Sequence, residues 1–221
     1  DDYYFEENNK EDLIVIFGSD GHSVNAPPSF NFYNLLRDNK SYDKLFLRDF
    51  KRNYYLDGLG NTTKNFYETI DFIRKIISKK GYRTVFSLGS SSGGFAAILY
   101  GNILKFKKVL AFNPQTVLSK EKELEIKDFT FGDRASKILR QKNISDNYYQ
   151  NCLNLKKFIP FTTKVEIHYS ELSEIDRNYA EFIKHHNCIL VNHESSSHLL
   201  AYELRESGKL KSIILNSLKT D

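Results

Sequence analysis

The stretch TVFSLGSSSGGFAAILYG, residues 84–101, decides the fold that this sequence predicts. Its first five residues favour a buried strand, a glycine-rich turn follows, and the apolar run from Phe95 to Tyr100 favours a helix. The turn contains the pattern G-x-S-x-G, which places Ser91 at the apex of a nucleophile elbow. Gly89 and Gly93 leave room where the strand and helix backbones approach each other. The alternative is a serine- and glycine-rich loop that only joins a strand to a helix.

The composition is typical of a globular protein with one domain, residues 1–221. A length of 221 residues is enough for one sizeable domain with a full core, and the hydrophobic content of 40% and charged content of 27% are ordinary for a globular protein. The net charge of +4 comes from scattered basic residues, so nucleic-acid binding is not predicted. No apolar run approaches the ~20 residues of a membrane span. The chain begins at Asp1 and contains no Met, so a targeting segment is left open. Cys152 and Cys188 lack C-x-x-C spacing, which argues against a metal site or a disulfide framework and favours a reducing, cytoplasmic compartment.

Short apolar runs alternate with helical patterns, which favours an α/β fold with a mostly parallel sheet and helices on both faces. Strands are predicted at 13–17, 45–47, 84–88, 109–112, 165–169 and 188–191, and helices at 30–36, 63–80, 95–100, 178–185, 199–206 and 210–218. The first eleven residues are expected to form an edge segment or a loose arm. Residues 117–163 are charged and lack a long period, which indicates a small cap inserted over the top of the sheet.

Partners for Ser91 are expected at the carboxyl ends of the strands, where ligands bind in such sheets. A serine hydroxyl needs an imidazole to take its proton, and the imidazole needs a carboxylate to hold it. His198 is the preferred base because a polar loop after the last strand carries it. His193 lies nearer the strand end, where it can be a structural hydrogen-bonding group. The chain order Ser, acid, His is the order expected for an elbow in this kind of sheet.

Asp176 is the preferred acid of this set. It lies between the strand at 165–169 and the next helix, where a short carboxylate is readily held rigid. It can at the same time be the N-cap of that helix. Glu171 and Glu174, on the same loop, are the rival acids.

Two backbone N–H groups are needed to bind the oxyanion of an acyl-transfer reaction. Ser92, which follows the nucleophile, is expected to supply one. The loop after the first strand is expected to supply the other, from Gly18, Ser19 or Asp20, with Ser19 preferred. His22 in that loop is expected either to be structural or to line the acyl pocket.

Other polar residues follow the strands beside the elbow. Asn113 and Gln115 lie after the strand at 109–112, and they are interpreted equally well as sugar-binding groups or as partners of loop backbone. Arg48 and Asp49 follow the strand at 45–47 and are interpreted as a buried ion pair beside the sheet.

Three segments carry a family resemblance: LGSSSGGFAAILYG (88–101), AFNPQT (111–116) and SHLLAYELRESGKL (197–210). The chain resembles the α/β-hydrolase fold superfamily over nearly its whole length, apart from residues 117–163. More narrowly, it resembles bacterial proteins of surface-polysaccharide loci, such as the capsule O-acetyltransferases with a similar G-S-S-x-G-G elbow. The resemblance implies a triad of Ser91, Asp176 and His198 and a carbohydrate-linked acyl ester as substrate. The chain lacks the H-G-G-G loop of common esterases, so the resemblance does not assign the second oxyanion donor.

The expected function is acyl transfer through an acyl-Ser91 intermediate. Transfer to water makes the protein an esterase, and transfer to a sugar hydroxyl makes it an O-acetyltransferase. The chemistry requires no bound metal or organic cofactor, and acetyl-CoA is the co-substrate expected for a transferase. The expected partner is a small-molecule or carbohydrate ester, and the oligomeric state is left open. The alternatives are a non-catalytic hydrolase-like binding or scaffold domain, and a thioesterase or lipase.

Overall fold

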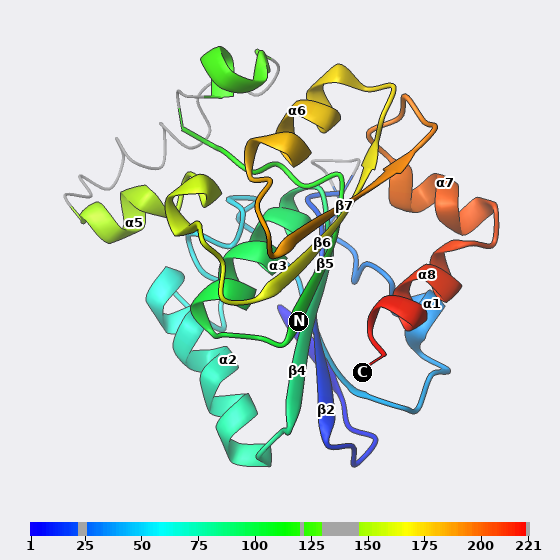
Figure 1. Ribbon diagram of the computed structural model, residues 1–221. Helices are drawn as coiled ribbons and strands as arrows, with labels where there is room; N and C mark the ends of the chain where they lie inside the picture. Colours follow the sequence, from blue (N-terminus) through cyan, green and yellow to red (C-terminus); the bar gives the residue numbers. More distant parts are fainter. Residues whose placement is uncertain (22–25, 120–121, 130–145, 220–221) are drawn as a thin grey trace.

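One mostly parallel sheet organises the protein. The computed structural model describes residues 1–21, 26–119, 122–129 and 146–219. These residues contain a seven-stranded sheet in the order β1-β3-β2-β4-β5-β6-β7 (Figure 1). Its strands are β1 (Tyr3–Glu6), β2 (Asp12–Phe17), β3 (Asp43–Leu47), β4 (Thr84–Ser90), β5 (Lys108–Phe112), β6 (Lys164–Ser170) and β7 (Cys188–His193). β1 pairs with β3 in the antiparallel sense, and all other neighbours are parallel. The predicted α/β sheet is confirmed, with the N-terminal segment as its edge strand.

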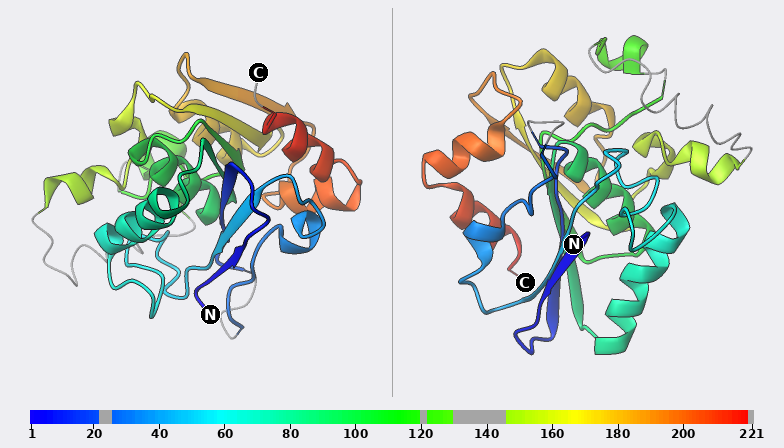
Figure 2. Two further views of the ribbon diagram at one scale, coloured as in Figure 1. Left: turned by 90° about the horizontal axis from the view of Figure 1, so that it is seen from below. Right: turned by 180° about the vertical axis from the view of Figure 1, so that it is seen from behind.

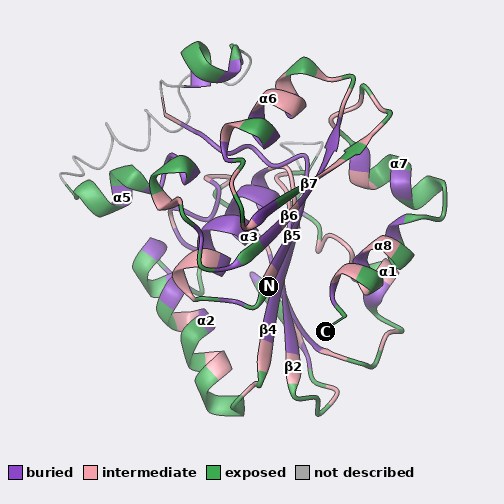
Figure 3. Cartoon of the chain, viewed as in Figure 1, coloured by how far each residue is buried: buried purple, intermediate pink, exposed green. Residues whose placement is uncertain are grey.

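Helices cover both faces of the sheet (Figures 1 and 2). One face carries α2 (Phe66–Lys80), α3 (Ser92–Ile103) and α6 (Glu174–Phe182), and the other carries α1 (Tyr33–Leu36), α7 (Leu200–Glu206) and α8 (Leu210–Ser217). Successive side chains of a strand point to opposite faces, so β2 places Leu13, Val15 and Phe17 in the first core and Ile14 and Ile16 in the second. Figure 3 shows that α3 is buried along most of its length. Among the described helices, none is both long enough and apolar enough to cross a bilayer.

The helix boundaries differ from prediction by about one turn at several places. The helix predicted at 30–36 begins at Tyr33, and the one predicted at 95–100 spans Ser92–Ile103. α2 begins at Phe66 and not at residue 63, because the Asn65 side chain caps it by accepting the Glu68 N–H. It ends at Gly81 as predicted. The prediction of a helix over 178–185 is wrong by about one turn, since α6 spans Glu174–Phe182 and has Ser173 as its N-cap. The first turn of α6 is mostly polar, so the apolar periodicity did not indicate where the helix begins.

The segment 117–163 is described in part. It contains a π-helical turn, η1 (Lys122–Ile126), the short helix α5 (Asn147–Asn151) and the 3-10 helix η2 (Leu155–Phe158). Val117 pairs with Asn154 in a short antiparallel bridge, and Tyr149 and Leu155 are buried in the core that also contains α2. The two ends of the segment are therefore anchored on the α2 face of the sheet. Residues 120–121 and 130–145 lie outside the described residues, and the cap remains a prediction.

Candidate active site

The turn between β4 and α3 has the backbone geometry of a nucleophile elbow. Ser91 lies at its apex with φ 53° and ψ −122°, a conformation that non-glycine residues rarely adopt. A Cβ atom on Gly89 would lie 2.0 Å from the Gly93 carbonyl oxygen, and one on Gly93 would lie 2.3 Å from that of Phe17. Both glycines are thus required by the close approach of β2, β4 and α3. The turn presents the Ser91 side chain at the carboxyl ends of the strands.

The close packing at Gly93 leads to a stability prediction. We expect Gly93→Ala to destabilise the fold by about 3 kcal/mol or more, since the new methyl group meets rigid backbone on β2. Gly208→Ala is the matched control: Gly208 has φ 73° and open space around it, so alanine there costs only about 1–2 kcal/mol of backbone strain. Urea unfolding midpoints measure both variants. Equal losses in the two would show that the elbow has room for a side chain.

Ser91, His198 and Asp176 form one hydrogen-bonded chain. The Ser91 Oγ lies 2.9 Å from His198 Nε2, and His198 Nδ1 lies 2.7 Å from Asp176 Oδ1. A carboxylate only accepts hydrogen bonds, so Nδ1 carries the imidazole proton and Nε2 is left to accept from the Ser91 hydroxyl. The Asp176 side chain is 2% exposed, whereas that of His198 is 40% exposed. The three residues predicted from the sequence are therefore brought together, with the carboxylate at the buried end.

Asp176 occupies the first turn of α6. The preceding Ser173 is the cap: its Oγ accepts the Asp176 N–H at 3.3 Å. The prediction that Asp176 itself caps the helix is wrong, which leaves its carboxylate available to His198. The helix N-terminus favours negative charge at this position. The local sequence S-x-x-D therefore builds a fixed, charged support for the imidazole.

The rival residues have other positions. Glu174 is exposed, and its Oε1 lies 3.7 Å from Lys127 Nζ. The Glu171 carbonyl accepts a hydrogen bond from the Arg177 guanidinium, and its N–H donates to His193 O at the end of β7. Neither has a described hydrogen bond to His198. His193 Nε2 lies 2.8 Å from His168 Nδ1, inside the sheet. His193 is thus held as a structural hydrogen-bonding group, the alternative that the sequence left open.

The partner of this histidine pair is Glu166. Its Oε1 lies 2.8 Å from His168 Nε2, and its Oε2 lies 2.7 Å from Lys108 Nζ. Burial acts to raise the pKa of the Glu166 carboxyl, but hydrogen bonds from His168, Lys108 and Ser217 outweigh it and lower the pKa to about 2. The network ties β5, β6 and β7 to the C-terminal helix.

A lowered pKa in the folded state contributes stability above the unfolded pKa, and that contribution is lost as pH falls through the folded pKa. For Glu166 the window runs from about 4.5 down to about 2. We expect Glu166→Gln to lose about 3 kcal/mol at pH 7, a difference that shrinks towards pH 2. Urea unfolding at several pH values measures it, with the exposed Glu206→Gln as control. A loss that stays constant across this pH range would contradict the assignment.

Asn113 supports the loop that carries His198. It is fully buried, and its amide nitrogen lies 3.1 Å from Ser197 O, 3.0 Å from His198 O and 3.0 Å from Ser170 Oγ. Its Oδ1 accepts the Ser170 N–H at 2.9 Å. Asn113 therefore satisfies loop backbone, one of its two interpretations.

Gln115 contacts the reactive pair itself. Its Oε1 and Nε2 each lie 3.3 Å from Ser91 Oγ, and its Nε2 lies 3.4 Å from His198 Nε2. The side chain comes from the loop after β5 and is 5% exposed. Its amide therefore lies beside both Ser91 Oγ and His198 Nε2.

The loop after β2 lies against the start of α3. The Asp20 N–H donates to Ser92 Oγ at 3.1 Å, and the Ser92 hydroxyl donates to Asp20 Oδ1 at 3.1 Å. The Gly18 N–H donates to Leu47 O. Among the described residues, the N–H groups of Ser19 and Ser92 have no hydrogen-bond partner. These are the two amides predicted to bind an oxyanion, and that role remains a prediction. The remaining predicted residue of this loop, His22, lies outside the described residues.

A buried cage behind this loop was not found by sequence reasoning. Asp49 accepts the backbone N–H groups of Lys51, Asn53 and Tyr55, and the Tyr55 hydroxyl donates to Gly18 O at 2.8 Å. The predicted ion pair of Arg48 with Asp49 is wrong, since the guanidinium bonds backbone carbonyls and lies 4.1 Å from the Phe30 ring centroid. Burial raises the pKa of the Asp49 carboxyl to about 6. The tyrosines and glycines of residues 54–60 are the only sequence signal for this cage, and they predict no more than a loop.

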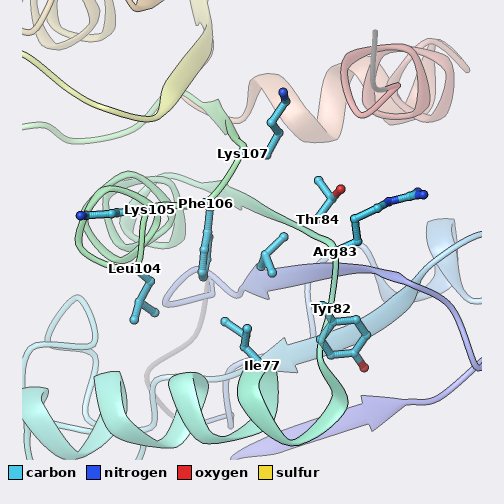
Figure 4. A pocket seen from close by; sticks show the side chains of 9 residues that line it. Ile77, Tyr82, Arg83, Thr84, Leu104, Lys105, Phe106 and Lys107 are labelled. Carbon is cyan, nitrogen blue, oxygen red and sulfur yellow. The ribbon is translucent and has the colours of Figure 1, made fainter.

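A cavity of about 720 Å³ lies at the other end of the strands, where β4 and β5 begin (Figure 4). Ile77, Tyr82 and Phe106 are among its lining residues, and the amino groups of Lys105 and Lys107 point away from it. Ser91 does not line it. The described part of the chain also contains no group of three or more His, Cys, Asp or Glu side chains that could hold a metal ion.

This chain is similar to known proteins in its structure. No protein-family model and no curated protein sequence matches it. The capsule O-acetyltransferase of Neisseria meningitidis serogroup A, solved as a variant in complex with CoA, has a TM-score of 0.64 at 16% identity, over 95% of this chain and 92% of that one. MenH from S. aureus has a TM-score of 0.54 at 15% identity, over 98% of this chain and 97% of that one. An α/β hydrolase enzyme from a Medee basin deep-sea metagenome library has a TM-score of 0.55 at 14% identity, over 99% of this chain and 96% of that one. These likenesses concern the fold, and this chain has the α/β-hydrolase fold.

Proposed function

We propose that this protein is a serine-nucleophile acyl-transfer enzyme. Ser91 Oγ attacks the carbonyl carbon of an acyl ester while His198 Nε2 takes its proton. The oxyanion that forms is bound by the backbone N–H groups of Ser92 and Ser19. The leaving group departs with the proton from His198, and the acyl group stays on Ser91. Water or a hydroxyl group then accepts it.

The observation that carries the proposal is the chain of distances through the three side chains. The 2.9 Å contact of Ser91 Oγ with His198 Nε2 permits proton transfer, and the 2.7 Å contact with Asp176 fixes the tautomer that makes it possible. The positive φ of Ser91 supports it further, since strained backbone at an elbow holds the hydroxyl clear of its own helix. A loop that only joined β4 to α3 would need neither feature.

A fluorophosphonate probe tests the proposed nucleophile, because it modifies only an activated serine. We expect one label per chain, located on Ser91 by mass spectrometry of the digested protein, and no label on protein unfolded in urea. A folded protein that takes up no label would support a non-catalytic scaffold. Label on another serine would overturn the assignment of the site.

The proposed substrate class is an O-acyl ester on a carbohydrate. It is supported by the three sequence segments that resemble surface-polysaccharide proteins and by the fold shared with a capsule O-acetyltransferase solved with CoA. As a transferase the enzyme would use acetyl-CoA as acyl donor, and as an esterase it would use water as acceptor. The mechanism draws on side chains and backbone of this chain, with no metal or bound organic cofactor.

Free thiol released from acetyl-CoA, measured with and without a polysaccharide acceptor, separates the two outcomes. Release that rises with the acceptor indicates a transferase. Thiol release at the same slow rate with and without the acceptor, together with hydrolysis of aryl acetates, indicates an esterase.

A further inference from the structure

Gln115 directs its amide at Ser91 and His198, whereas Asn113 directs its amide at the surrounding loops. Asn113, two residues earlier on the same loop, has its amide fully engaged with backbone and Ser170. The described hydrogen bonds of the Gln115 amide go only to Ser91 and His198. Gln115 therefore does not brace the fold with this group. It places both a donor and an acceptor at the reactive pair.

The geometry of these contacts is that of a site ready to exchange partners. The three distances are 3.3, 3.3 and 3.4 Å, longer than the usual 2.9 Å of a good hydrogen bond. The side chain is 5% exposed, so an amide left without partners here would carry a desolvation cost. Contacts of this length leave the Gln115 amide able to bond a small hydroxyl compound placed beside His198 Nε2.

The second half of an acyl transfer requires such a hydroxyl compound at this place. Its oxygen must lie near His198 Nε2, which takes its proton, and near the acyl carbon carried by Ser91 Oγ. As that oxygen bonds to the acyl carbon, the bond from carbon to Ser91 Oγ breaks, and His198 returns the proton to Ser91. The single Ser91 hydroxyl proton is directed at His198 Nε2 in the free protein and is absent once Ser91 is acylated. Gln115 Nε2 then donates to the oxygen of the incoming hydroxyl compound, whose own proton is directed at His198 Nε2.

We propose that Gln115 binds the acceptor hydroxyl or water of the second step and holds it at His198 Nε2. The inference rests on the proposed acyl-transfer function and deepens it: the acceptor is water or a hydroxyl compound whose oxygen accepts from the Gln115 amide N–H while its own O–H donates to His198 Nε2. Gln115 has no role in delivering the first proton, since His198 already contacts Ser91 directly. Its removal therefore affects deacylation more than acylation.

Stopped-flow measurement with p-nitrophenyl acetate separates the two steps, because the burst reports acylation and the steady rate reports deacylation. For Gln115→Ala we expect an acylation rate within about 3-fold of wild type and a deacylation rate lowered 10-fold or more. Intact-mass measurement should then show acetyl-Ser91 accumulating. With glycerol as acceptor, the share of acetyl groups passed to glycerol should fall, because the amide that binds the acceptor is missing. Gln115→Asn, which keeps the amide but withdraws it, should behave like the alanine variant.

Gln150→Ala, the same truncation on the exposed surface of α5, is the control and should match wild type. Equal loss of acylation and deacylation in Gln115→Ala would mean that Gln115 only positions Ser91 and His198, and would overturn the inference. Unchanged rates in both steps would overturn it as well. Absence of p-nitrophenol release catalysed by the wild-type protein, together with absence of fluorophosphonate label on Ser91, would instead be a failure of the proposed acyl-transfer function.

Discussion

Ser91→Ala is expected to lower the turnover of p-nitrophenyl acetate by about 10⁴-fold or more, to the level of the oxyanion amides acting alone. The variant keeps the backbone that positions the Ser92 N–H and removes only the oxygen that lies 2.9 Å from His198 Nε2. Because the missing atom is the one that forms the bond, no neighbouring hydroxyl at the elbow replaces it. Initial rates at saturating substrate, corrected for spontaneous hydrolysis, measure the effect.

The neighbouring Ser90→Ala is the matched control for this experiment. Ser90 ends β4 in the same serine-rich turn but has no described hydrogen bond to His198. We expect its turnover to stay within a few-fold of wild type, and both variants to unfold at nearly the same urea concentration. Turnover that is retained in Ser91→Ala but lost in Ser90→Ala would show that Ser90, and not Ser91, is the nucleophile. That result would contradict the proposed mechanism.

The elbow and the order of its partners could be predicted because their physical requirements are local in sequence. Close approach of β4 and α3 demands glycine, so Gly89 and Gly93 mark the turn wherever it lies in the fold. Burial of parallel strands demands continuous apolar runs, so each central strand was visible as a short run bounded by turn residues. Residues that follow such strands gather at one edge of the sheet, so Asp176 and His198 could be predicted to lie near Ser91.

The contacts of the supporting residues could not be predicted, because they depend on which strands are neighbours; for Asn113 the sequence offered loop backbone only as one of two interpretations. Asn113 reaches the His198 loop only because β5 lies beside β6, with β7 next in order. The Asp49 cage depends on a loop with positive φ at Arg52, Tyr54 and Tyr55, which no propensity favours. These features depend on contacts between distant residues or on strained backbone. The periodicity of hydrophobic residues in the sequence predicts neither of them.

The adjacent supports also explain why one short motif can hold three side chains in line. Ser91 is fixed by the strained turn, His198 by the Asn113 amide that binds its carbonyl, and Asp176 by the capped first turn of α6. Each support belongs to a different strand end, β4, β5 and β6. The arrangement of the strands therefore determines the distances between the Ser91, His198 and Asp176 side chains.

Asp176→Asn is expected to lower turnover by about 10⁴-fold while leaving the fold intact. The introduced asparagine amide is close to the size of the carboxylate, so the buried site is filled as before. It can, however, donate to His198 Nδ1, which favours the tautomer with the proton on Nε2. That nitrogen then cannot accept the Ser91 proton, and the general base is lost even though all three side chains remain in place. Initial rates with p-nitrophenyl acetate, together with the rate of fluorophosphonate labelling at Ser91, measure the loss.

The rival acids provide the controls, because each is a carboxylate on the same loop or helix. Glu174→Gln and Glu171→Gln remove a charge within a few residues of Asp176 but have no described contact with His198. We expect turnover within a few-fold of wild type in both, and an Asp176→Asn midpoint of urea unfolding close to theirs. A large loss in either rival with activity retained in Asp176→Asn would transfer the role of the acid. Equal loss in all three would mean that the general charge of this edge, and not the 2.7 Å contact, supports His198.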